Sequence, residues 1–112
     1  MAWTLARHEE ACTLSDVARA AFNLLRQGGR LEFIIRADRA VEALLTLKEA
    51  RMEPKRIRLI CPSIDRSPNL MLVEATRGGN PGVRWEPPLI VYDAHGVYTP
   101  ELQAIYGKTG EQ

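Results

Sequence analysis

The stretch LLRQGGRLEFIIR, residues 24–36, joins two different structural elements. An amphipathic segment ends at Gly28-Gly29, and an apolar run follows at once from Leu31 to Ile35. Glycine readily takes the left-handed backbone that ends a helix, and a short apolar run bounded by turn residues is typical of a buried strand. The stretch therefore predicts a helix that stops at the glycine pair and a strand over 31–35, one helix-to-strand unit of an α/β sheet.

The helix before this strand has a recognisable start at Thr13-Leu-Ser-Asp16. A threonine hydroxyl can cap the first free N–H groups, and an acidic side chain is favoured in the positive first turn. The helix is therefore expected to begin near Leu14. Its apolar face at helical spacing comprises Leu14, Val17, Ala18, Ala21, Leu24 and Leu25.

A second helix is expected after the strand, with Asp38 as its cap and an end at Met52-Glu53-Pro54. Its predicted shared face consists of Val41, Leu44, Leu45 and the stem of Lys48. Residues 57–61 form the next apolar strand. A strand, a helix and a strand in this order predict two parallel strands joined by a right-handed crossover.

The remainder of the chain predicts a hairpin and a tail. Residues 62–68 are turn-forming, and 69–76 read as a strand antiparallel to 57–61. A break at 77–82 precedes an extended piece at 89–92 and a turn at 93–96, and Thr99-Pro100-Glu101 predicts a helix start that continues to about Tyr106. We expect two parts, an α/β unit over 1–77 and a tail over 78–112 that packs on it.

Bulk composition indicates one small globular domain. The chain has 112 residues, 46% of them hydrophobic and 26% charged, with a formal net charge of +1. It lacks an apolar run of the roughly 18 residues that a membrane helix needs and shows no export signal. A soluble cytoplasmic protein without membrane contact is expected, and with so small a net charge any RNA contact must come from a local patch.

Four segments carry a resemblance to a known enzyme family: ARHEEACTLSDVARAAFNLLRQGGRL, MEPKRIRLICP, PNLMLVEATRGGNPG and PPLIVYDAHGVYTPELQAIYG. In this order they resemble the C-terminal half of the bacterial adenine-N6 methyltransferases that modify valine tRNA, over about Ala6 to Gly107. These are class I enzymes that depend on S-adenosylmethionine. The resemblance implies the C-terminal part of a Rossmann-like α/β sheet, with three strands in the spatial order fifth, seventh, sixth, the last one antiparallel, and flanking helices.

Two defining parts of that family are absent from the sequence. No glycine-rich loop follows a first strand, and no Asn-Pro-Pro-aromatic tetrad is present. The glycines at 28–29 and 78–82 lack G-x-G-x-x-G spacing. In relatives the string matching ARHE follows shortly after the tetrad, so we expect a truncated C-terminal portion that begins just past the catalytic motif and is inactive alone. S-adenosylmethionine is then the cofactor of the full-length family, with no catalytic or cofactor-binding residue and no cofactor expected in this chain.

The resemblance places Arg7 and His8 just after the catalytic loop, where a cationic pair could meet phosphate or position a base. The alternative is a solvated N-terminus. Lys55, Arg56 and Arg58, with Arg51 and Arg66 nearby, form the densest basic stretch. That stretch fits contact with RNA phosphates, or equally a charged strand edge that prevents pairing between sheets.

Other side chains carry weaker predictions. Tyr92, Tyr98 and Tyr106 fit either stacking on unpaired bases or fastening of the tail to the sheet. The soft metal ligands are His8, Cys12, Cys61 and His95, and their spacing does not favour zinc, so no metal site is expected.

Partners follow from the resemblance and from the sheet. tRNA is the implied substrate. The strand at 31–35 pairs with a fourth strand in the resembled family, so here its edge is expected to be bare and covered by a homodimer or by an N-terminal partner fragment. The alternative to a methyltransferase portion is a non-catalytic assembly or RNA-binding module.

Overall fold

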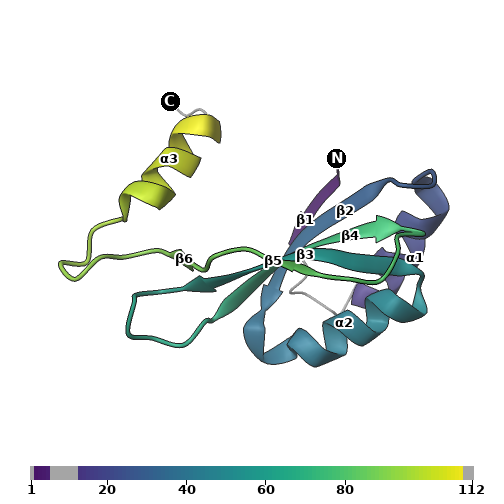
Figure 1. Ribbon diagram of the computed structural model, residues 1–112, viewed down its shortest axis with the longest axis horizontal. Coiled ribbons are helices and arrows are strands. Elements are labelled where there is room, and N and C mark those ends of the chain that lie inside the picture. The colour runs from purple at the N-terminus through teal and green to yellow at the C-terminus, as the bar shows by residue number, and fades with distance from the viewer. Residues whose placement is uncertain (1, 6–12, 110–112) are drawn as a thin grey trace.

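The computed structural model describes residues 2–5 and 13–109 (Figure 1). The elements in chain order are β1 (Ala2–Leu5), α1 (Leu14–Leu24), β2 (Arg30–Arg36), the 3-10 turn η1 (Ala37–Arg39), α2 (Ala40–Glu49), β3 (Met52–Cys61), β4 (Leu70–Arg77), β5 (Arg84–Trp85), β6 (Leu89–Ile90) and α3 (Pro100–Thr109). None of the helices in this described part has the length and apolar character needed to span a bilayer.

The strands form one mixed sheet in the order β1-β2-β4-β3-β5, with β6 pairing β3 farther along. β4 is antiparallel to both β2 and β3, so β2 and β3 run parallel to each other. The crossover through α2 and the hairpin of β3 and β4 are thus confirmed. The spatial order β2-β4-β3 is the one that the resemblance implied for the last three strands, and the predicted α/β fold class is confirmed.

β1 is a strand that the sequence did not predict. Ala2–Leu5 pairs in parallel with residues 31–34 of β2. The expectation of a bare edge along 31–34 was therefore wrong, because the chain's own N-terminal residues occupy it. A run of four residues is too short to reveal a strand by periodicity. The outermost strand on this side is now β1, and any partner that continues the sheet would meet β1.

Both helices of the α/β unit lie on one face of the sheet (Figure 1). Alternate residues of β2 and β4 point at them, so Phe33 and Val73 are fully buried between sheet and helices. The core also includes Leu14, Ala18, Ala21, Leu31, Ile35, Ala43, Leu47, Met52, Ile57, Met71 and Ala75. Neither α1 nor α2 lies on the other face of the strands.

α1 begins as predicted and ends earlier. Thr13 and Asp16 form a reciprocal capping box, in which Asp16 N–H donates to Thr13 Oγ1 at 3.1 Å and Thr13 N–H donates to Asp16 Oδ2 at 3.2 Å. The helix stops at Leu24, whose side chain is 85% exposed, so its predicted burial was wrong. Gly28 does have a left-handed φ of 84°, yet it lies in the turn that leads into β2 and donates its N–H to Arg77 O.

α2 buries a different stripe from the predicted one. Its buried residues are the small Ala43 and Leu47, whereas Val41 and Leu45 are exposed. Residues four positions apart lie on one side of a helix, so Ala43 and Leu47 form the stripe that faces the sheet, and of the predicted face only Leu44 packs against the core. Asp38 does not cap the helix, because it lies in η1 and pairs with Arg36.

The passage from α2 to β3 also differs from the prediction. α2 ends at Glu49, and Arg51 turns the chain with a φ of 62°. β3 then begins at Met52, whose buried side chain joins the core, five residues before the predicted strand start. Between Pro54 and Arg56 the pairing with β4 contains a bulge, in which Lys55 has no partner residue. A proline is tolerated at such a bulge because its missing N–H interrupts no ladder bond there.

The tail follows the predicted order of elements. β5 and β6 both pair in parallel with β3. The turn at 93–96 is closed by a bridge between Tyr92 and Tyr98. The predicted helix start is confirmed, with Thr99 Oγ1 accepting from Leu102 N–H, and α3 extends to Thr109. α3 lies at the end of β6, away from α1 and α2 (Figure 1). The division at residue 77 stays a prediction.

Candidate functional site

A row of charged residues crosses the face of the sheet that lacks α1 and α2. Glu32 of β2 is paired with Glu74 of β4, and Glu74 is paired with Arg56 of β3. Because side chains alternate along a strand and Phe33 and Val73 point into the helical core, Glu32 and Glu74 point to the opposite face. Both glutamates are nevertheless buried, at 6% and 7% exposure. Buried carboxylates require partners.

Arg56 supplies most of those partners. Its guanidinium lies 3.4 Å from Glu32, 3.2 Å from Glu74 and 3.6 Å from Glu86, measured between nitrogen and oxygen atoms. Arg30 adds a contact of 3.3 Å with Glu74. We call these five residues the charged row. Arg56 was predicted to contact RNA phosphates, and here its charge is already compensated by three carboxylates.

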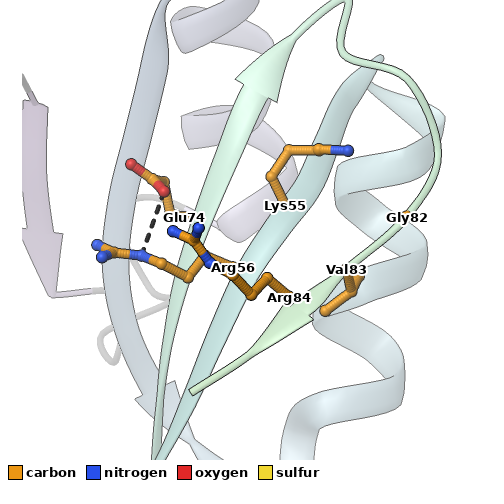
Figure 2. A pocket seen from close by; sticks show the side chains of 6 residues that line it. All are labelled: Lys55, Arg56, Glu74, Gly82, Val83 and Arg84. Carbon is orange, nitrogen blue, oxygen red and sulfur yellow. Dashed lines mark ion pairs between the residues drawn. The ribbon is translucent and has the colours of Figure 1, made fainter.

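A groove of about 490 Å³ lies beside the charged row (Figure 2). Its lining comprises Lys55, Arg56, Glu74, Gly82, Val83 and Arg84. The Lys55 ammonium donates to the carbonyl of Asn80 at 2.7 Å, which fastens the loop between β4 and β5 to β3. The side chain of Arg84 is 74% exposed, with Glu86 at 3.9 Å. Both cations thus keep free N–H donors for a ligand.

The other basic residues of the predicted stretch lie apart from this groove. Arg58 pairs with Glu101 of α3, and its buried Nε has no hydrogen-bond partner. Arg51 lies in the turn just before β3 and Arg66 in the loop after its end, so the five basic residues do not form one patch. β4 and β5 flank β3 at 56–57, and β4 and β6 flank Ile60, so the charged-edge interpretation does not describe these positions. Arg7 and His8 lie outside the described residues.

The predicted aromatic and metal candidates give little chemistry. The rings of Tyr92 and Tyr98 pack against each other with centroids 5.4 Å apart, while the side chain of Tyr106 is outside the described part. Cys61 is buried and free, and His95 lies on the exposed turn. His8 and Cys12 also fall outside the described residues. Within residues 2–5 and 13–109, no group of three or more His, Cys, Asp or Glu side chains could hold a metal ion.

The carboxyl edge of the parallel strands is the other place to seek a site, because open α/β sheets bind ligands there. β2 ends at Arg36, which pairs with Asp38 at 2.6 Å. The chain passes from β2 through η1 into α2 without a glycine, so this connection offers no phosphate cradle. In the neighbouring loop of 62–69, a hydrogen bond from Ser63 lowers the pKa of Asp65.

Comparison with known proteins agrees with this topology. No protein-family profile and no curated protein matches the sequence. The chain is similar to the crystal structure of a predicted O-methyltransferase, protein Atu636 from Agrobacterium tumefaciens, with a TM-score of 0.82 and 22% identity over 98% of this chain. The described fold is one part of a methyltransferase-like fold. The match covers 51% of the Agrobacterium protein, so this chain spans about half the length of that protein.

Sequence reasoning missed five charged residues that shape the site, namely Glu32, Glu74, Arg84, Arg30 and Glu86. Glu32 and Glu74 had a visible signal, because each is a single acidic residue in the middle of an otherwise apolar strand. Such an interruption indicates a strand with one face outside the core. Arg84 had no comparable signal, since its place beside the groove depends on the short pairing of β5 with β3.

Proposed function

We propose that this chain is the C-terminal half of a class I methyltransferase that transfers methyl from S-adenosylmethionine to adenine N6 in tRNA. We further propose that it acts only together with a cofactor-binding half. The observation that carries the proposal is the spatial order β2-β4-β3 with β4 antiparallel to both neighbours. The structural similarity to about half of a methyltransferase-like protein supports it.

The described residues do not fit the cofactor by themselves. A class I fold holds S-adenosylmethionine at a glycine-rich turn between a strand and a helix, and the connection from β2 to α2 has no glycine. The Arg36 and Asp38 side chains at that edge are paired with each other. We assign the chain itself no step of methyl transfer, and we give it a structural and substrate-binding role.

The acceptor and the substrate rest on the sequence resemblance. Four ordered segments resemble adenine-N6 methyltransferases of valine tRNA, whereas the similar crystal structure is described as a predicted O-methyltransferase. A ring amine and a hydroxyl oxygen are different acceptors, and a substrate assay separates them.

The test supplies the missing half. Calorimetry of this chain with S-adenosylmethionine is expected to give no heat of binding. The chain is then co-expressed with the N-terminal half of a bacterial valine-tRNA adenine-N6 methyltransferase, ending after its Asn-Pro-Pro tetrad, and the complex is expected to bind S-adenosylmethionine and to methylate adenine in a tRNA transcript. Micromolar cofactor binding by the chain alone would contradict the proposal, as would a complex that methylates only hydroxyl groups.

A non-catalytic assembly module is the second candidate, and one observation favours it. β1 is the terminal strand of the sheet, so the backbone groups on its outer side are unpaired within the described residues. An open strand edge is a template for pairing with another chain. Homodimerisation through β1, or pairing with an N-terminal partner fragment, would satisfy that edge. Light scattering tests the homodimer directly, and a stable monomer would count against it.

A further inference from the structure

We propose that the β5 edge, defined as Lys55, Arg84 and Trp85, binds an unpaired stretch of RNA. In this arrangement Trp85 stacks on a base, and Lys55 and Arg84 contact the neighbouring phosphates. The inference rests on the proposed RNA substrate and adds the surface that receives it. Of the three basic residues that the sequence stretch from 55 to 58 suggested, this surface keeps Lys55 and leaves out Arg56 and Arg58.

Trp85 is the first observation behind this site. Its backbone pairs with Ile57 of β3, yet the residue is 63% exposed. An exposed indole on an ordered strand presents a flat apolar surface to solvent. Aromatic side chains of this kind stack on unpaired bases in RNA recognition, and stacking accepts any base because every base has a π-face.

The charge balance beside Trp85 is the second observation. Around the groove, the four cations Arg30, Lys55, Arg56 and Arg84 face the three carboxylates Glu32, Glu74 and Glu86, so 4 − 3 leaves one positive charge in surplus. Glu86 lies closer to Arg56 than to Arg84, at 3.6 Å against 3.9 Å. The surplus charge therefore resides on Lys55 and Arg84, which border the groove.

The strand geometry explains how one RNA segment meets both kinds of contact. Arg84 and Trp85 are consecutive in β5, so their side chains leave on opposite faces of the sheet. Arg84 is directed toward the groove beside Arg56 (Figure 2). A strand of RNA that runs along the edge would place its phosphates on the groove side and a base on the Trp85 side.

The position of β5 in the sheet leaves this surface open. β1 and β5 are at opposite ends of the strand order. A cofactor-binding half that continues the sheet beyond β1 would therefore not cover β5. Three strand spacings separate β2 from β5, which is about 14 Å at the usual spacing between paired strands. A tRNA is much longer than this distance. An RNA whose target base lies at the carboxyl edge of β2 can therefore also reach the β5 edge.

The test measures RNA binding by the whole chain alone, using fluorescence anisotropy with a short fluorescein-labelled oligouridylate. Trp85→Ala is expected to weaken binding at least about fivefold, the lower end of the contribution from one stacked base, while Trp85→Phe keeps most of the affinity. Arg84→Gln is expected to reduce the slope of log K against log salt by about 0.7, the value for one phosphate contact on a single strand. Arg26→Gln, which removes an exposed arginine in the turn between α1 and β2 that has no ion pair within the described residues, is the matched control and should change neither quantity.

The outcomes separate this inference from the proposed function. Equal RNA affinity of the wild type and Trp85→Ala would overturn the inference. Equal reductions of the salt slope by Arg84→Gln and Arg26→Gln would also overturn it, because that pattern indicates unspecific electrostatic attraction. Circular dichroism of each variant checks its fold. If Trp85→Ala unfolds, Trp85→Phe still tests the inference, because a folded Trp85→Phe variant that no longer binds the RNA would overturn it. If the completed enzyme methylates tRNA and Trp85 proves irrelevant, the inference alone fails. If RNA binds through the β5 edge and the completed protein never binds S-adenosylmethionine, the proposed function alone fails.

Discussion

The two faces of the central strands are made from the same residues in alternation and have opposite chemistry. Toward α1 and α2, Phe33 and Val73 are fully buried in an apolar core. Toward the other side, their neighbours Glu32 and Glu74 are buried almost as completely, and arginines surround them. Burial alone therefore does not distinguish the faces. The difference lies in what each face requires of its contacts.

The covered face needs volume and shape, and any apolar side chain of the right size contributes to it. The charged face needs specific partners, because a carboxylate without a counter-charge is costly where water is scarce. A protein that needed only stability could fill both faces with apolar residues. The charged row instead orients Arg56 and leaves Lys55 and Arg84 at a groove, so this face carries the candidate site.

The difference between the two faces should be largest for a cavity in the face that α1 and α2 cover. Phe33→Ala should lower the free energy of unfolding by about 3–5 kcal/mol, because Phe33 is fully buried and the space cannot refill. Urea denaturation followed by circular dichroism measures the change. Ile34→Ala, one residue away on the other face, is the matched control and should cost clearly less, since Ile34 is only partly buried. Equal losses would show that the faces do not differ in packing.

On the charged face, removal of one charged partner should lower the free energy of unfolding more than removal of the arginine and both buried glutamates together. Arg56→Met should lower the free energy of unfolding by about 2–3 kcal/mol, because it leaves Glu32 and Glu74 without their main counter-charge; the estimate is reduced for the partial exposure of Arg56. The triple variant Glu32→Leu, Arg56→Met, Glu74→Leu should return close to wild-type stability. A triple variant as unstable as Arg56→Met would mean that the row is held by packing and not by charge.

A smaller effect concerns the start of α1, on which the covered face depends. Thr13→Ala removes the hydroxyl that accepts from Asp16 N–H and should cost about 1 kcal/mol in urea denaturation. Thr13→Ser keeps an acceptor oxygen and serves as the control. A loss equal for both variants would show that the threonine methyl group, and not the cap, is responsible.

The same cap predicts a response to acid. The hydrogen bond from the Thr13 backbone N–H, aided by Arg19, lowers the pKa of Asp16 below its ordinary value of 3.8. A carboxylate with a lowered pKa stabilises the fold fully above pH 3.8, and this stabilisation is lost as the pH falls through the folded-state pKa. Asp16→Asn should therefore flatten the stability curve below pH 3.8. An unchanged acid limb would assign the loss to other carboxyl groups.

The smallest expected effect is at α3. Glu101→Gln breaks the ion pair with Arg58 and should change the free energy of unfolding by less than about 1 kcal/mol, because Glu101 is half exposed. The tail should nevertheless be cleaved faster by a protease, since this pair connects α3 to β3. Glu49→Gln, which alters an exposed acid on α2 that has no ion pair with the tail within the described residues, should leave the cleavage rate unchanged. Equal rates in both variants would show that the pair does not hold α3.

The sequence predicted those features that depend on local signals. The cap at Thr13, the turn glycines and the apolar runs located α1, β2, β3, β4 and the start of α3, because each feature is determined within a few residues. The buried stripe of α2 was mispredicted, since large side chains at 41 and 45 suggested a face that the sheet did not accept. β1 and β5 could not be recognised, because strands of four and two residues form only where a neighbour is ready to pair.

The candidate site was predictable only in part for the same reason. A run of basic residues is visible in a sequence, but the compensation of a charge is a property of three dimensions. Arg56 meets carboxylates that come from β2, from β4 and from the residue after β5, far from it in the chain. The cations that keep free N–H donors for a ligand are Lys55, from the predicted stretch, and Arg84, from a strand that no periodicity revealed.

Because Lys55 lies in the bulge of β3, its charged side chain belongs to a residue that takes no part in the strand pairing. Pro54 pairs with Ala75 and Arg56 with Glu74, which are consecutive in β4, so Lys55 is the one residue of this stretch that the ladder does not use. Loss of its single codon would join Pro54 directly to Arg56 and leave every other pairing of the hairpin in place. This position can therefore lose a residue without a shift of register in the rest of the hairpin, which makes it a point where related chains can differ in length and in charge while keeping the same sheet.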